Sequence, residues 1–231
     1  MNHFDMIIIG AGLSGIGAAC HLQSKHPNKS YKIIESRERM GGTWDLFRYP
    51  GVRSDSDMHT LGYSFKPWLS AKAIADGPAI RDYIKESAAE FGVDQHIQYE
   101  RKVVAASWDS ATAQWTLTLE NTGDLDGSTA EPETLTCNFI YSCTGYYRYN
   151  QGFTPDFPDA DQFKGQVVHP QLWPEDLDYS GKRVIVIGSG ATAITLVPSL
   201  AKTASHVTML QRSPTYVLSR PDEDAVSQKL R

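Results

Sequence analysis

The stretch Met6-Ile-Ile-Ile-Gly10-Ala-Gly-Leu-Ser-Gly15 decides the fold. Its four leading apolar residues are typical of a strand that is buried on both faces. The glycines at 10, 12 and 15 form a GxGxxG turn, in which the first permits a tight turn, the second lets the backbone approach a pyrophosphate and the third lets helix and strand pack closely. Residues 16–23 favour a helix, whose amino terminus attracts phosphate.

An acidic residue completes this motif. Tyr31-Lys-Ile-Ile34 reads as the second strand, and it ends at Glu35, 20 residues after Gly15. A carboxylate in that place accepts hydrogen bonds from the hydroxyls of a ribose. The alternative, a glycine-rich turn beside a surface glutamate, is disfavoured because strand, turn, helix and acid all stand in the order that the motif requires.

The same pattern recurs late in the chain. Residues 183–187 read as a strand, Gly188-Ser-Gly-Ala-Thr-Ala193 as a turn, 194–202 as a helix and 206–212 as a strand. Ala193 replaces the third glycine, a variant that the motif allows. The sequence therefore predicts an α/β fold with two Rossmann-like dinucleotide-binding domains.

The two turns differ in charge. Gln211 and Arg212 stand where the second turn would need its acid. An acid there would repel a 2′-phosphate, whereas arginine can pair with one through two hydrogen bonds. We therefore expect FAD at the first turn and NADPH, in preference to NADH, at the second. The alternative reading makes Arg212 an ordinary surface residue.

The segments between the turns are less regular. We predict an ordered loop over 41–66, a helix over 79–91 that Gly92 ends, a hairpin of 103–108 with 115–120, a surface loop over 121–133, a strand from 139 to a turn at 145, and a linker over 146–180.

Composition narrows the function. The chain has 231 residues, 41% of them hydrophobic and 21% charged, with a net charge of −5, which gives no electrostatic case for nucleic acid as a partner. Its three cysteines include no CxxC pair, which disfavours a zinc site and a disulfide reductase. No apolar run is long enough for a transmembrane segment or a signal peptide. A cytoplasmic enzyme or binding protein is expected, with peripheral membrane association left open.

Three further segments carry a resemblance. Phe163-x-Gly165-x-x-x-His169-x-x-x-Trp173-Pro174 matches the fingerprint FxGxxxHxxxWP of Baeyer–Villiger monooxygenases at all five fixed positions. Gly41-Gly-Thr-Trp44 with residues 48–55 resembles the flavin-contacting loop of that family, and Ser142-Cys-Thr-Gly145 is similar to its strand end. The resemblance runs from about Met6 to Arg220, and within the family it points to the actinobacterial enzymes that activate the thioamide prodrug ethionamide.

The resemblance implies a domain plan and a reaction. The plan is half an FAD domain over 1–145, a fingerprint linker over 146–180 and part of an NADPH domain over 181–231. NADPH would reduce FAD, O2 would add to give a C4a-peroxyflavin, and one oxygen atom would enter a ketone to form an ester or lactone. Sulfides or thioamides are further candidate substrates.

Site residues follow from both lines of reasoning. Asp55 is implied as the catalytic acid beside the flavin, and His169 is implied to be structural. The first glycine turn and its acid predict Gly10, Gly12, Gly15 and Glu35 as FAD residues, and the resemblance implies Ser14, Thr43, Trp44, Asp45, Leu46 and Val103. Asp55 is also an expected cofactor-binding residue, beside the flavin. The second glycine turn predicts Gly188, Gly190, Ala193 and Arg212 as NADPH residues, and the resemblance implies Arg53, Ser54, Ser189, Ala191, Thr192, Ile194 and Ser213. No metal site is expected.

Two rival functions remain open. One is an N- or S-oxygenating flavin monooxygenase, which shares both turns but whose fingerprint lacks Trp173-Pro174. The other is a non-catalytic nucleotide-binding fragment. Members of the Baeyer–Villiger family are about twice this long and carry their catalytic arginine beyond position 231. We therefore expect that this chain alone does not turn over, and that its unfinished sheet exposes an apolar edge.

Overall fold

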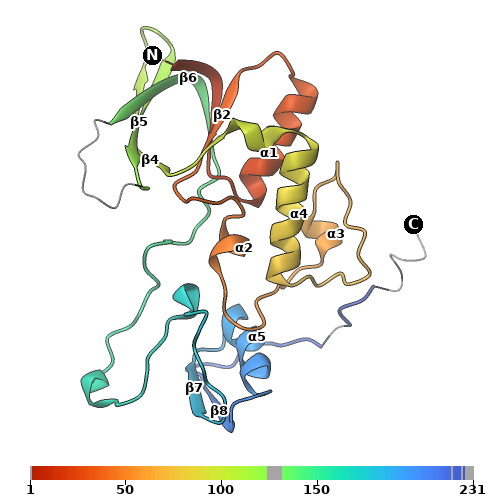
Figure 1. The fold of residues 1–231 in the computed structure, drawn as a ribbon, viewed down its shortest axis with the longest axis vertical. Coiled ribbons are helices and arrows are strands. Elements are labelled where there is room, and N and C mark those ends of the chain that lie inside the picture. The colour runs from red at the N-terminus through yellow and green to blue at the C-terminus, as the bar shows by residue number, and fades with distance from the viewer. Residues whose placement is uncertain (1, 124–131, 220, 225, 227–231) are drawn as a thin grey trace. The chain divides into compact units, whose positions relative to one another are not determined.

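The computed structural model describes residues 2–123, 132–219, 221–224 and 226 (Figure 1). Contacts divide the chain into two compact units: Met1–Asp45 with Arg81–Tyr146, and Leu46–Ile80 with Tyr147–Arg231. Each unit is therefore assembled from two separate stretches of sequence. The allocation of 1–145, 146–180 and 181–231 to FAD domain, linker and NADPH domain stays a prediction.

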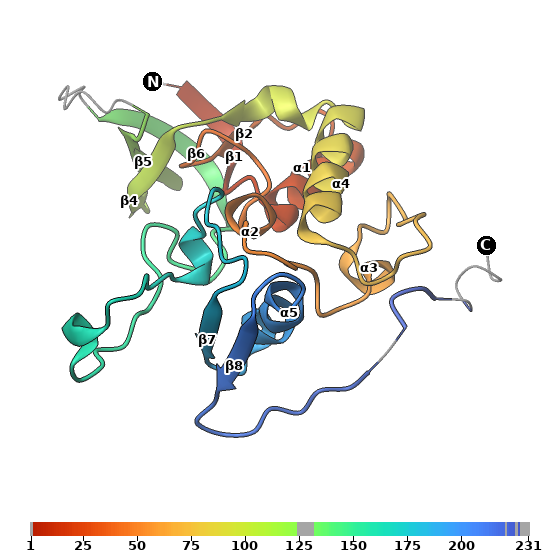
Figure 2. The ribbon, with the colours of Figure 1, turned by 60° about the horizontal axis from the view of Figure 1, so that its bottom comes forward.

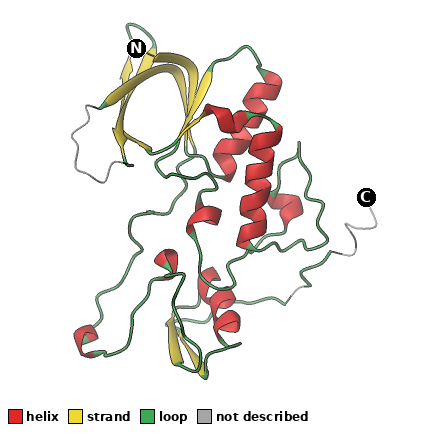
Figure 3. Cartoon of the chain, in the orientation of Figure 1, coloured by secondary structure: helices red, strands yellow, loops and turns green. Residues whose placement is uncertain are grey.

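The first unit is built on one six-stranded sheet with strand order β3-β2-β1-β6-β5-β4. Strand β1 pairs in parallel with β2 and with β6, and β2 pairs in parallel with β3. Strand β5 pairs in antiparallel with β4 and with β6. Figure 3 shows these strands curling around a common interior. The strands are β1 (Asn2–Ile9), β2 (Tyr31–Ile34), β3 (Ile97–Gln98), β4 (Arg101–Asp109), β5 (Gln114–Asn121) and β6 (Glu133–Ser142).

Strand register places the first glycine turn. Ile9 is paired with Ile34 of β2 on one side and with Ser142 of β6 on the other. The carboxyl ends of these three parallel strands are therefore level. Gly10, Glu35 and Cys143, which follow them, start from the same edge of the sheet, where open α/β sheets bind their ligands.

Both faces of β1 are buried, as its apolar run predicts. Ile7 joins the core inside the curl with Ile34, Leu117, Leu119, Leu135 and Cys137. Ile8, on the opposite face, is also fully buried, as are Ile16, Ala19 and Cys20 of helix α1 (Leu13–Lys25). Helix α4 (Gly77–Glu90) lies beside α1 (Figures 1 and 2) and leads through Gly92 into the short helix η1 (Val93–His96).

The second unit contains a smaller strand–helix–strand element. Strands β7 (Arg183–Ile187) and β8 (His206–Leu210) are parallel, and helix α5 (Ala191–Leu200) connects them. Ala193, Leu196 and Leu200 are the buried apolar residues of α5. The unit also contains the short helices α3 (Met58–Leu61), η2 (Ala160–Gln162) and η3 (Pro170–Leu172). The short helix α2 (Thr43–Leu46) crosses the boundary between the two units in the sequence, because its last residue, Leu46, is the first residue of the second unit.

The structure confirms the α/β fold class and both strand–turn–helix–strand patterns. The predicted helix over 79–91 is α4, and the predicted hairpin is β4 with β5. Two expectations were too simple. The strand expected from 139 begins at Glu133, because only Leu135 and Cys137 mark its buried face among polar neighbours. The stretches read as loop and linker contain α2, α3, η2 and η3. Most of the loop predicted over 121–133 lies outside the described residues.

Candidate cofactor sites

The first glycine turn joins β1 to α1 by close backbone packing. Gly10 has a φ of 104°, and a Cβ added there would stand 2.5 Å from the carbonyl oxygen of Cys143. A Cβ on Gly15 would overlap the carbonyl oxygen of Gly10. These two glycines are therefore required by the protein itself, one by the turn and one by the contact between helix and strand.

Gly12 is different, because no contact among the described residues demands a glycine there. Its φ is −81°, which any residue adopts, and an added Cβ would meet only backbone atoms of Gly42, with the Cα at an ordinary 3.5 Å. Gly12 is also the N-cap of α1, and no side chain caps the helix there. An open helix amino terminus beside a residue without a side chain suits a pyrophosphate.

Glu35 is buried against this turn, with 5% of its surface exposed. Its Oε2 accepts a hydrogen bond from the backbone N–H of Ala11 at 2.8 Å, and its Oε1 accepts one from the N–H of Arg37 at 2.9 Å. A carboxylate has about four acceptor positions, so these bonds fix its orientation and leave capacity for ribose hydroxyls. The predicted partnership between the turn and its acid is present as a direct contact.

The Gly41–Asp45 segment lies over the same turn. Gly41 donates its N–H to the carbonyl of Ala11 at 2.9 Å. Asp45, expected to contact FAD, is 1% exposed and forms an ion pair with Arg37 at 2.8 Å between Oδ2 and Nη2. The sequence reasoning did not identify Arg37. Ser14 is exposed, Thr43 and Trp44 are half-buried, and Val103 packs against the core inside the sheet.

The second glycine turn is more open. Gly188 has a φ of 119° and Gly190 is the N-cap of α5, again without a side-chain cap. An added Cβ on either residue would have no heavy atom of the described chain within 4 Å. Since an added Cβ would point into open space at both positions, the described chain leaves room for a ligand there.

Hydroxyl groups connect the second turn to the end of β8. Ser189 donates from its Oγ to the carbonyl oxygen of Ser213 at 3.3 Å, and Thr215 donates to the Oγ of Ser189 at 2.7 Å. Arg212 is exposed and precedes this pair of contacts by one residue. The structure thus brings the segment carrying Arg212 and Ser213 to the turn, and it adds Thr215, which the sequence reasoning missed.

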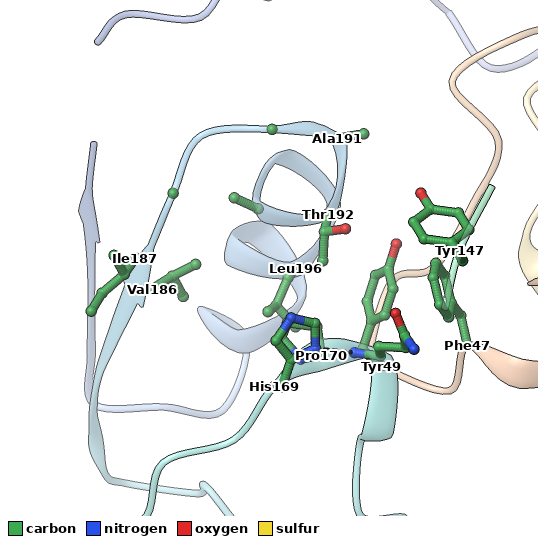
Figure 4. A pocket seen from close by; sticks show the side chains of 14 residues that line it. Phe47, Tyr49, Tyr147, His169, Pro170, Val186, Ile187, Ala191, Thr192 and Leu196 are labelled. Atoms are coloured by element: carbon green, nitrogen blue, oxygen red, sulfur yellow. Dashed lines mark hydrogen bonds between the residues drawn. The ribbon is translucent and has the colours of Figure 1, made fainter. Parts of the chain in front are cut away.

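A pocket of about 320 Å³ lies in front of the second turn (Figure 4). That volume is at the lower end of the range for small-molecule sites. Figure 4 shows Val186 and Ile187 on one side and Phe47 with Tyr147 on the other. The lining residues are Phe47, Tyr49, Tyr147, His169, Pro170, Gln171, Val186, Ile187, Gly188, Gly190, Ala191, Thr192, Ala193 and Leu196.

The fingerprint residues have close local neighbours, and one of them, His169, lines this pocket. A Cβ on Gly165 would stand 2.5 Å from the ring of Phe163, and one on Gly152 would overlap the ring of His169. His169 Nδ1 accepts the N–H of Gln171 at 3.2 Å and so caps η3. Trp173 packs edge-on against Tyr179. These contacts suit the structural role expected for His169.

The loop that carries Asp55 belongs to the second unit. Gly51 lies against Ser199 and Thr195 of α5. Ser54 is buried and donates its N–H to the carbonyl of Ala75 at 2.9 Å, while Arg53 and Asp55 are exposed. The contact between Gly51 and Ser199 could not be predicted from the sequence, because the two residues lie far apart along the chain and no local motif links them.

Comparison with known proteins gives the family. Residues 73–229 match the model of the flavin-binding monooxygenase-like family, and residues 8–76 match that of the NAD(P)-binding Rossmann-like domain. The chain belongs to the flavin-binding monooxygenase-like family. The two descriptions confirm the predicted cofactor classes, a flavin and NAD(P).

Particular relatives agree with this assignment. The chain is 55% identical over 230 residues to the FAD-containing monooxygenase EthA of Mycobacterium tuberculosis, covering 99% of this chain and 46% of EthA. It is similar to a steroid monooxygenase bound to NADP (TM-score 0.82, 28% identity, 99% and 42% covered) and to OTEMO in complex with FAD and NADP (TM-score 0.74, 33% identity, 91% and 39% covered). The chain thus spans about half the length of EthA.

No helix among the described residues could cross a membrane.

Proposed function

We propose that this chain forms part of an FAD- and NADPH-dependent monooxygenase of the Baeyer–Villiger type. One observation carries the proposal: two glycine turns follow parallel strands, and the residues beside them have opposite charges. Glu35 is buried against the first turn, while Arg212 is exposed next to the segment tied to the second. A carboxylate suits a ribose diol and a guanidinium suits a 2′-phosphate.

Different residues of the chain bind the two cofactors. Gly12 and the amino terminus of α1 leave room for the pyrophosphate of FAD, and Glu35 holds its ribose. Gly188, Gly190 and the amino terminus of α5 receive the pyrophosphate of NADPH. Bound flavin, once reduced by NADPH, supplies the activation of O2, of which one atom enters the substrate and the other leaves as water.

Asp55 is proposed as the acid that acts beside the flavin. Its carboxylate is exposed on a loop whose neighbours are held in place, with Ser54 bonded to Ala75 and Gly51 seated on α5. A carboxylate in such a place would orient a neighbouring cation, and that cation would stabilise negative charge that develops during the reaction. The substrate class is proposed to be ketones, with sulfides or thioamides as further candidates.

The 231-residue chain is proposed to be inactive alone. It spans 46% of EthA, and apolar side chains of its strands are exposed, among them Phe139, Tyr141, Ile185, Ile187 and Leu210. Exposed apolar strand faces of this kind normally lie against further protein. Steady NADPH- and O2-dependent turnover by the 231 residues would contradict this.

The proposal is tested on the complete purified protein. We expect a flavin absorbance spectrum that NADPH bleaches faster than NADH at equal concentration, followed by conversion of a cyclic ketone to its lactone with O2 consumption. Sulfoxide from a sulfide without any lactone would favour the rival N- or S-oxygenating activity. Bound nucleotide without reduction would favour a non-catalytic module.

A further inference from the structure

The second glycine turn is joined to the end of β8 by a chain of two hydrogen bonds. The hydroxyl of Thr215 donates to Ser189 Oγ at 2.7 Å, and Ser189 Oγ donates in turn to the carbonyl oxygen of Ser213 at 3.3 Å. Because the Ser189 hydroxyl both accepts and donates along this chain, the two bonds reinforce each other. Ser189 is therefore held at two points of one short segment.

That segment is constrained from within as well. Pro214 lies between the two bonded residues, and proline fixes its own φ and restricts the residue before it to extended conformations. The segment therefore has few conformations available once both ends are bonded to Ser189. Arg212 is the residue directly before it, so these contacts restrict the backbone on the carboxyl side of Arg212.

The Arg212 side chain itself has no equivalent restraint within the part of the chain that the structure describes. It is exposed, and Gly188 donates its N–H to the carbonyl of Leu210 at 2.8 Å, which ties the strand end but not the guanidinium. A flexible arginine loses conformational entropy when it binds a phosphate, and a fixed backbone lowers that loss. Any restraint on residues 213–215 should therefore strengthen phosphate binding in particular.

We propose that Thr215, acting through Ser189, is a positioning residue that sets Arg212 for the 2′-phosphate of NADPH. This rests on the proposed function, in which Arg212 makes that contact. Ser189 is an unsuitable test residue, because it lies in the turn that receives the pyrophosphate common to NADPH and NADH. Thr215 lies outside the turn, so the loss of its hydroxyl should weaken binding of the phosphorylated cofactor alone.

The experiment uses the complete flavin-loaded protein and the substitution Thr215→Val, which keeps the size of the side chain and removes its donor. Binding of adenosine 2′,5′-bisphosphate and of 5′-AMP is measured by calorimetry, with NADP⁺ and NAD⁺ as a second pair. We expect the affinity for each 2′-phosphorylated ligand to fall about fivefold, the effect of losing one ordinary hydrogen bond, and the affinity for its partner to stay unchanged.

Two controls make the result specific. Thr208→Val alters an exposed threonine of β8 in the same unit and should leave all four affinities unchanged. Thr215→Ser retains the donor and should keep the wild-type ratio. Should Thr215→Val fail to fold, Thr215→Ala replaces it with the same expectation.

The outcomes distinguish a failure of the positioning role of Thr215 from a failure of the proposed NADPH preference. If Arg212→Ala abolishes the preference for 2′-phosphate and Thr215→Val leaves it intact, the positioning role is wrong and the NADPH assignment stands. An equal loss for both members of each pair would show a merely structural role and would also overturn the inference. If Arg212→Ala has no effect either, the proposed NADPH preference itself fails.

Discussion

Gly51 lies so close to Ser199 that a side chain on Gly51 would overlap the serine hydroxyl and stand 2.5 Å from the carbonyl oxygen of Thr195. Gly51 also has a φ of 82°, in the left-handed region that L residues avoid. The contact seats the loop before Asp55 on the helix that begins at the second glycine turn. Both conformation and space therefore require glycine at position 51.

Replacing Gly51 with alanine should destabilise the second unit by about 3 kcal/mol, from backbone strain of about 1–2 kcal/mol and from overlap with α5. Gly181→Ala is the matched control, because Gly181 has a φ of 68° but no atom within 4 Å of an added Cβ. It should show the strain alone. Thermal unfolding of the two variants measures the difference, and equal losses would remove the role of the α5 contact.

Gly12→Ala should separate flavin binding from folding. The added Cβ meets only an ordinary contact, so the stability should change by less than about 0.5 kcal/mol, while flavin affinity should fall by about tenfold or more. Gly15→Ala, whose Cβ would overlap the backbone of Gly10, should destabilise the fold itself. Flavin content and unfolding midpoints test this. A Gly12→Ala protein that retains its flavin would count against a pyrophosphate at this turn.

Glu35→Gln should weaken both the turn and its ligand. An amide offers one acceptor oxygen, so either Ala11 or Arg37 would direct its N–H at the new NH2 group. An unsatisfied buried donor costs about 1–3 kcal/mol. Glu38→Gln, on an exposed side chain, is the control. Chemical denaturation and flavin absorbance are the measurements, and wild-type values for both would show that the charge is dispensable.

Asp45→Asn tests the buried ion pair. The change replaces the buried carboxylate that pairs with Arg37 by a neutral amide. Breaking a buried ion pair costs about 3 kcal/mol, and the cost is expected to be lower here because the Arg37 side chain is 19% exposed. Asp82→Asn breaks the exposed pair with Arg81 and should have almost no effect. Unfolding midpoints compare the two variants. A similar loss in both would mean that burial of Asp45 is not what matters.

The thiols should differ in reactivity. Burial raises the pKa of Cys20 to about 11, so about one thiol in a thousand is ionised at pH 8, and the side chain is fully buried. Burial also raises the pKa of Cys143, whose side chain is partly accessible. Iodoacetamide followed by peptide mass spectrometry should find Cys143 labelled first and Cys20 only after unfolding. Rapid native labelling of Cys20 would contradict its burial.

The local features of this structure could be predicted from the sequence. Gly10 is required by the turn and Gly15 by the packing of helix on strand, as the motif describes. Strand β1 could be recognised from its apolar run because both of its faces are buried. The pairing of Glu35 with the turn followed from its place at the end of the second strand, 20 residues after Gly15.

Other features depend on contacts that no local pattern encodes. The seat of Gly51 on Ser199 joins residues far apart in the chain, and the ion pair of Asp45 with Arg37 involves charges that read equally well as surface groups. Thr215 was missed for the same reason, since its donated bond reaches back to Ser189.

The interleaving of the two units limits how the molecule can be dissected. Residues 46–80 belong with the segment after Tyr146, although they lie between the two stretches of the first unit. A protein cut at residue 146 would keep Gly51 and lose the helix on which it rests. Either half prepared by simple truncation would carry an orphaned surface, so the first unit would have to be isolated by replacing residues 46–80 with a linker.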